Sequence, residues 1–112
     1  MDVTLNISGG YNGDLYCYLT HGSGFSVLLN RVGQTSLNPG GYGDTGFAVT
    51  LSDLAATDIH NYQTVGYALN ANGQLMGTWQ PDGRTADPAT VLDTATRSAF
   101  LSSFNTLSPN GQ

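Results

Sequence analysis

Short segments in which apolar and polar residues alternate recur along this chain of 112 residues. Residues 3–7 have the sequence VTLNI, and the same two-residue period returns in 14–20 and in 46–51. Because the side chains of a β-strand point to opposite faces in turn, this period predicts strands with one buried and one exposed face. The alternation therefore indicates an all-β fold.

Clusters of turn-forming residues separate the predicted strands, as in 21–24 and 81–83. Glycine, asparagine, proline and aspartate in such clusters are typical of tight turns. Residues 25–32 and 75–80 complete the predicted strands, and 25–32 is apolar enough for burial on both faces. Because no linker and no internal repeat interrupts the pattern, we predict one domain, residues 1–112, built as a β-sandwich or barrel.

Three stretches between the predicted strands have weaker patterns. Residues 52–56 predict a single helical turn, capped by Ser52 or Asp53. Residues 65–69 predict a short strand. The apolar residues of 88–104 have a spacing closer to that of a helix, which predicts one or two helical turns in a crossing loop.

The charge of the chain is low and acidic, with eight aspartates, three arginines and a net charge of −5. Binding to nucleic acid depends on lysine and arginine that neutralise phosphates, so this composition argues against a nucleic-acid partner. No segment approaches the roughly 20 apolar residues that a membrane-spanning helix needs. Residues 1–7 enter the strand pattern directly, without the basic and apolar regions of an export signal. We therefore expect a soluble segment with no membrane partner.

Six segments, in order along nearly the whole chain, resemble a known family. They are residues 3–7, 13–19, 26–31, 46–55, 77–83 and 104–111. Together they resemble the P domain, the β-sandwich that follows the catalytic domain of subtilisin/kexin-like proprotein convertases and is attached to many bacterial exported proteins. The resemblance implies a jelly-roll or galactose-binding-like β-sandwich that acts as a non-catalytic binding and stabilising module. It also implies that the parent protein is secreted or displayed on the cell surface.

The family pattern continues beyond the last residues of this chain. In P domains, a turn like that at 109–111 leads into a strand that begins with Trp and then into a closing hairpin. The resemblance thus implies a sandwich that is incomplete at its C-terminus, and an incomplete sheet pairs readily with a strand from another chain. We predict that a complementary β-strand peptide, a neighbouring domain or a strand-swapped protomer binds near Phe104, Leu107, Asn110 and Gln112.

Aromatic residues are the candidate ligand platform. Tyr16 and Tyr18 share the face of their predicted strand that is opposite to the aliphatic face, and Trp79 lies in a later strand. Aromatic rings give a large contact area at low entropic cost, which suits sugars or peptides. The alternative function is therefore a carbohydrate-binding β-sandwich module. The competing interpretation is that these rings cover a second sheet.

Three aspartates in irregular segments are the candidate metal ligands. Asp44, Asp53 and Asp58 offer carboxylate oxygens, which Ca²⁺ prefers, and some P domains bind Ca²⁺ in loops of this kind. The paired acidic residues of the family correspond here to Ser52 and Asp53, which is one carboxylate fewer. The other interpretation is that all three are surface turn residues. No cofactor other than this calcium ion is expected.

Catalytic residues are not predicted. Cys17 with His21 or His60 would be a nucleophile and base, but Cys17 shares the aliphatic face of its strand. Four residues along a strand place His21 roughly 13 Å away. Asp14 and Asp82 stand in turn sequences and are interpreted as turn residues. The sequence therefore predicts a protein that is not an enzyme.

Overall fold

The computed structural model describes residues 2–104, and strands organised in two sheets dominate this part of the chain. The strands are β1 (Asp2–Ser8), β2 (Tyr16–His21), β3 (Gly24–Asn30), β4 (Gly46–Ser52) and β5 (Leu75–Trp79). The helical elements are three short 3₁₀ helices, η1 (Asn12–Asp14), η2 (Ile59–Thr64) and η3 (Leu101–Phe104). The predicted all-β class is confirmed.

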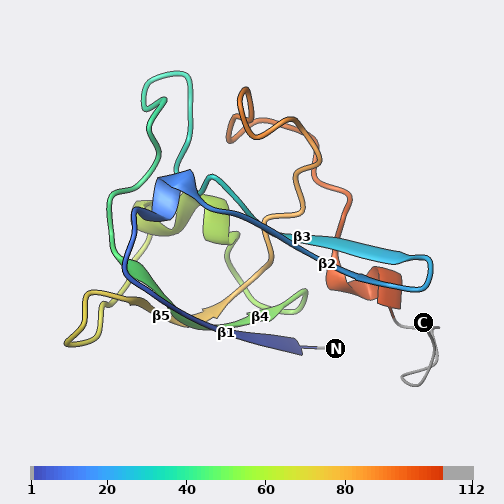
Figure 1. Ribbon diagram of the computed structural model, residues 1–112, viewed down its shortest axis with the longest axis horizontal. Helices are drawn as coiled ribbons and strands as arrows, with labels where there is room; N and C mark the ends of the chain where they lie inside the picture. Colours follow the sequence, from blue (N-terminus) through green and yellow to red (C-terminus); the bar gives the residue numbers. More distant parts are fainter. Residues whose placement is uncertain (1, 105–112) are drawn as a thin grey trace.

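One sheet has the strand order β1-β4-β5, and the other is the β2–β3 hairpin (Figure 1). Strands β1 and β4 are antiparallel, with Asp2 opposite Ser52, whereas β4 and β5 are parallel, with Phe47 beside Leu75. A parallel pair needs a long connection, which residues 53–74 supply. The hairpin is antiparallel and its register shifts between Cys17 and Tyr18, as at a β-bulge.

The core lies between the two sheets, because a single hydrophobic cluster takes side chains from both. In β4 the inward residues Phe47, Val49 and Leu51 are buried, and Ala48 and Thr50 between them are partly exposed. Residues Ser26–Asn30 of β3 are all buried, as its apolar sequence predicted. The molecule is therefore a two-layer, sandwich-like all-β structure.

The two sheets are joined on one side by the chain that follows β5. After Trp79, the chain crosses to the outer edge of β3, where the Asp82 N–H donates to Leu28 O (3.1 Å) and the Gly83 N–H donates to Val27 O (2.9 Å). We call this side, formed by β5, residues 80–84 and β3, the closed side. The opposite side is bounded by β1 and β2, the outermost strands of their sheets, and we call it the open side.

The weaker sequence patterns gave mixed results. Residues 65–69 are exposed and form no strand, although Leu69 makes an isolated bridge to Leu75. Ser52 ends β4, and residues 53–56 form a turn and a bend and not a helix. In 88–104, only η3 is helical, and the buried Val91 stands in irregular backbone. Tertiary packing of single apolar side chains overrides local propensity in these loops.

Candidate functional site

Apolar side chains on the open side are only half covered. The inward residues of β1 and β2, together with Leu15, pack against the core cluster but keep intermediate exposure: Val3, Leu5, Ile7, Leu15, Cys17 and Leu19. The strands next to them are different, because the inward residues of β3 and β4 are buried. The core is thus sealed along its middle and incompletely covered along β1 and β2.

Both strands of the open side also have an outer edge without a partner strand. Strand β1 pairs with β4 alone and β2 pairs with β3 alone, within residues 2–104. The outer edge of a strand presents N–H and C=O groups that pair readily with an added strand. Half-covered apolar residues and an unpaired strand edge therefore coincide on the open side.

The residues predicted to bind a strand do not lie on the open side where they are described. Phe104 is buried in the core cluster from η3. The neighbouring Ser103 Oγ accepts from the Phe25 N–H (3.0 Å) and donates to the Phe25 carbonyl (2.9 Å), which holds η3 beside β3. Leu107, Asn110 and Gln112 lie outside the described residues. The part of the candidate site that the structure describes is formed by β1 and β2.

Two of the three predicted platform residues lie together. The rings of Tyr16 and Tyr18 are 5.7 Å apart between centroids, and the ring of Phe25, on the facing strand, is 5.7 Å from Tyr18. Tyr18 is 55% exposed. The pKa of Tyr16 is raised, first by its burial and then by electrostatic interaction with the neighbouring Tyr18. Trp79, in contrast, is 5% exposed and belongs to the core. Phe25 was not predicted as part of this row; in the hairpin register it lies opposite Thr20, and its ring reaches Tyr18 diagonally across the two strands.

The three candidate metal ligands have separate partners. Asp44 Oδ2 accepts from the Tyr62 hydroxyl (2.6 Å), and Asp53 accepts from the backbone N–H groups of Leu101 and Ser102 (3.1 and 2.6 Å). Asp58 pairs with Arg84 at 2.6 Å. No group of three or more His, Cys, Asp or Glu residues that could hold a metal ion occurs in the described part of the chain. The calcium site stays a prediction of the sequence alone.

Asp82 has a structural role, but residues 81–83 form no turn, which corrects the interpretation of this segment. Its carboxylate is fully buried on the closed side, accepts from the Asn30 N–H (3.0 Å) and pairs with Arg84 Nη1 (3.1 Å). Asp82 Oδ2 also lies 2.8 Å from His60 Nδ1, and His60 Nε2 lies 2.9 Å from the Gln34 carbonyl. The sequence correctly predicted that the strand ends before Asp82, but only the tertiary structure reveals the burial of its carboxylate.

The suggested nucleophile and bases have other environments. Cys17 packs on the half-covered inner face of β2, and burial raises the pKa of its thiol, which disfavours the reactive thiolate. His60 is buried between Asp82 and Gln34 on the closed side. Asp14 is largely exposed and lies 3.8 Å from Arg31. These side chains therefore have structural contacts that do not depend on a reaction.

No family model, no curated protein and no solved structure matches this chain. Within residues 2–104, none of the helical segments is long and apolar enough to cross a lipid bilayer.

Proposed function

We propose that this chain is a non-catalytic binding and stabilising module that accepts an added β-strand on its open side. The observation that carries this proposal is the difference in burial between neighbouring strands. The inward residues of β3 and β4 are sealed, while those of β1 and β2 keep part of their apolar surface in water. An added strand removes that surface from water and pairs with an outer strand edge at the same time.

The energetic gain of such an addition is substantial for a domain of this size. Covering about 200 Å² of apolar surface contributes about 5 kcal/mol at 25 cal/mol per Å². The whole free energy of unfolding of a domain is about 5–15 kcal/mol. Binding of a strand would therefore stabilise this chain strongly.

The chemistry of the open side defines the occupant. It is an extended segment whose alternate residues are apolar, because β1 and β2 offer apolar side chains at every second position. A β-strand peptide, a neighbouring domain or a second copy that exchanges a strand are the possible sources. The resemblance to P domains and their jelly-roll connectivity belongs to this proposal, and it predicts that the strand begins with Trp.

Thermal unfolding with an added peptide tests the proposal. The peptide has about ten residues, begins with Trp and alternates apolar with polar residues, in the length range of natural strands. A ligand that binds the folded state raises the unfolding midpoint by mass action, so we expect a shift that grows with peptide concentration. Amide hydrogen exchange should slow in β1 or β2. The absence of any shift at high peptide concentration would refute strand addition.

A peptide of the same composition, reordered so that its apolar residues are consecutive, is the matched control. It retains the hydrophobicity but loses the two-residue period that places apolar side chains on one face. We expect it to shift the midpoint less than the alternating peptide. Equal shifts would indicate nonspecific hydrophobic association in place of strand pairing.

A second candidate function, carbohydrate binding, is supported by the exposed row of Tyr16, Tyr18 and Phe25 on the hairpin. Sugar rings stack on aromatic faces that are accessible to solvent. A glycan panel on the chain and on the variant Tyr18→Ala tests it. Binding that Tyr18→Ala abolishes would support this function, and no binding to any glycan would exclude it for the panel used.

A further inference from the structure

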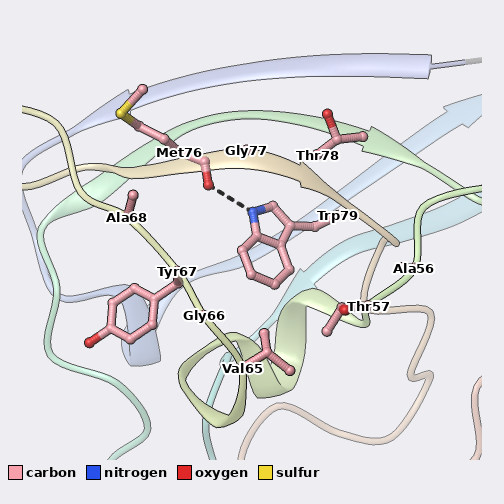
Figure 2. A pocket seen from close by; sticks show the side chains of 10 residues that line it. All are labelled: Ala56, Thr57, Val65, Gly66, Tyr67, Ala68, Met76, Gly77, Thr78 and Trp79. Atoms are coloured by element: carbon pink, nitrogen blue, oxygen red, sulfur yellow. Dashed lines mark hydrogen bonds between the residues drawn. The ribbon is translucent and has the colours of Figure 1, made fainter.

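An apolar hollow of about 720 Å³ lies beside β5, away from the open side. Figure 2 shows the Trp79 indole between β5 and the segment 65–68, with Tyr67 and Val65 on the other side of the space. None of the ten residues that line it carries a charged side chain. Val65, Tyr67 and Met76 at its rim keep 41–44% of their surface exposed. The hollow thus offers an uncharged apolar surface to a ligand.

The wall formed by Trp79 is fixed in place. Its indole Nε1–H donates to the Met76 carbonyl (2.9 Å), and the ring packs edge-on against Tyr62. A Cβ atom at Gly77 would lie 3.1 Å from Nε1, so glycine leaves room for the indole over the strand. Tyr67 also packs edge-on against Tyr62, with 5.4 Å between centroids. A rigid aromatic wall of this kind binds ligands at low entropic cost.

The backbone of β5 has an unpaired position in this hollow. The Met76 N–H donates to Ala68 O (3.0 Å) and the Gln80 N–H donates to Thr57 O (2.7 Å), both on the edge of β5 that faces away from β4. Thr78 is two residues from each, so its N–H and C=O point to that same edge. Among residues 2–104, neither group bonds to the loop segments that pair with Met76 and Gln80. The chain pairs this edge above and below Thr78 and leaves one position open.

We propose that this hollow binds an extended peptide, whose backbone pairs with Thr78 and whose apolar side chain contacts Trp79 and Tyr67. One donor and one acceptor on a single strand residue match the amide groups of another strand residue. The peptide residue opposite Thr78 shares the face of the Thr78 side chain. Its neighbours then project toward the face of Trp79, so one of them enters the hollow. The uncharged lining selects an apolar side chain there.

The test uses the blocked tripeptide acetyl-Leu-Ser-Leu-amide, in which Ser pairs with Thr78 and one Leu enters the hollow. Trp79 is the only tryptophan, so its fluorescence reports this site. We expect a saturable change with a dissociation constant in the millimolar range, as for small ligands. Amide chemical shifts should move at Thr78 and in 65–68. Absence of saturation, or shifts confined to β1 and β2, would overturn the proposal.

The same tripeptide with an N-methyl group on Ser is the matched ligand control. It keeps both Leu side chains but cannot donate to the Thr78 carbonyl, so we expect at least tenfold weaker binding. Equal affinity would overturn strand pairing. Tyr67→Ala should weaken binding of the parent peptide by a similar factor, and Tyr18→Ala, on the hairpin, should not. Melting curves of both variants show whether they are folded, and equal affinity of the folded variants would refute the assigned wall.

Discussion

The closed and open sides of this sandwich differ in how completely they cover the strand edges and the core. On the closed side, residues 80–84 cover the edge of β3 and bring Asp82 and Arg84 into full burial. On the open side, β1 and β2 have no covering segment within the described residues, and their inward side chains stay half exposed. The chain therefore uses several of its few charges to seal one side of the core and leaves apolar strand edges on the other.

Asp82→Ala should have the largest effect on stability, because it breaks the buried pairs of the closed side. Arg84 and His60 would lose a carboxylate that lies at 3.1 and 2.8 Å from their nitrogens. Removal of one partner from a buried ion pair costs about 3–5 kcal/mol of unfolding free energy. Urea denaturation followed by circular dichroism measures the loss.

Asp14→Ala is the control for this prediction. Asp14 is also an aspartate in an ion pair, but it is largely exposed and lies 3.8 Å from Arg31. Exposed pairs contribute little to stability, so we expect almost no change. If Asp82→Ala and Asp14→Ala lower the free energy of unfolding equally, the buried pairs do not seal the closed side.

A matched pair of leucines compares the two sides of the core directly. Leu51 of β4 is fully buried, whereas Leu5 of β1 is half covered on the open side. We expect Leu51→Ala to cost about 2–5 kcal/mol of unfolding free energy. Leu5→Ala should cost about 1–2 kcal/mol, because Leu5 removes less apolar surface from water. The urea unfolding midpoints of the two variants measure these losses. Equal losses of unfolding free energy would mean that the open side is covered in solution.

The strands were predictable from the sequence because each is a local pattern. Alternation placed Val3, Leu5 and Ile7 on the inner face of β1, and the same period identified β4. The closed side was not predictable in this way. Pro81-Asp82-Gly83 is a turn by its local sequence, and only contacts with the distant His60 and Asn30 make its carboxylate a buried group. The parallel pairing of β4 with β5 likewise depends on contacts between distant segments.

The candidate site was predictable in the same uneven way. The exposed tyrosines of β2 followed from alternation, whereas Trp79 shares a strand pattern but its ring folds over Gly77 into the core. The hollow beside Thr78 depends on how segment 65–68 lies relative to β5. The sequence predicted a strand at 65–69 instead. The sequence thus predicts side-chain positions that depend on the pattern of one strand. It does not predict positions that depend on how two distant segments pack together.

Tyr62→Phe should have a moderate effect that depends on pH. The Tyr62 hydroxyl donates to Asp44 (2.6 Å), and burial, followed by this hydrogen bond, raises its pKa well above the ordinary value of 10.0. Loss of the bond should cost about 1 kcal/mol at neutral pH. A raised pKa in the folded state stabilises it fully below pH 10, and this contribution is lost as the pH rises above 10.

The wild-type chain should therefore lose stability above pH 10, and Tyr62→Phe should lose less. Urea denaturation at neutral pH and at two pH values above 10 measures both slopes. Tyr11→Phe is a suitable control, because Tyr11 is 44% exposed. Parallel slopes for the wild type and Tyr62→Phe would show that another tyrosine governs the alkaline unfolding.

The alkylation of Cys17 is the smallest predicted effect and the most direct probe of the open side. Its readout is the rate of a reaction at one side chain and not the stability of the fold. Burial raises the pKa of its thiol, so less thiolate is present at neutral pH than in the unfolded chain. We expect slow modification by iodoacetamide in the folded chain, measured by mass spectrometry, and fast modification in urea. Because Cys17 lies on the half-covered inner face of β2, the alternating peptide should slow the reaction further. If saturating peptide stabilises the chain but leaves this rate unchanged, the peptide binds elsewhere and the open side is not its site.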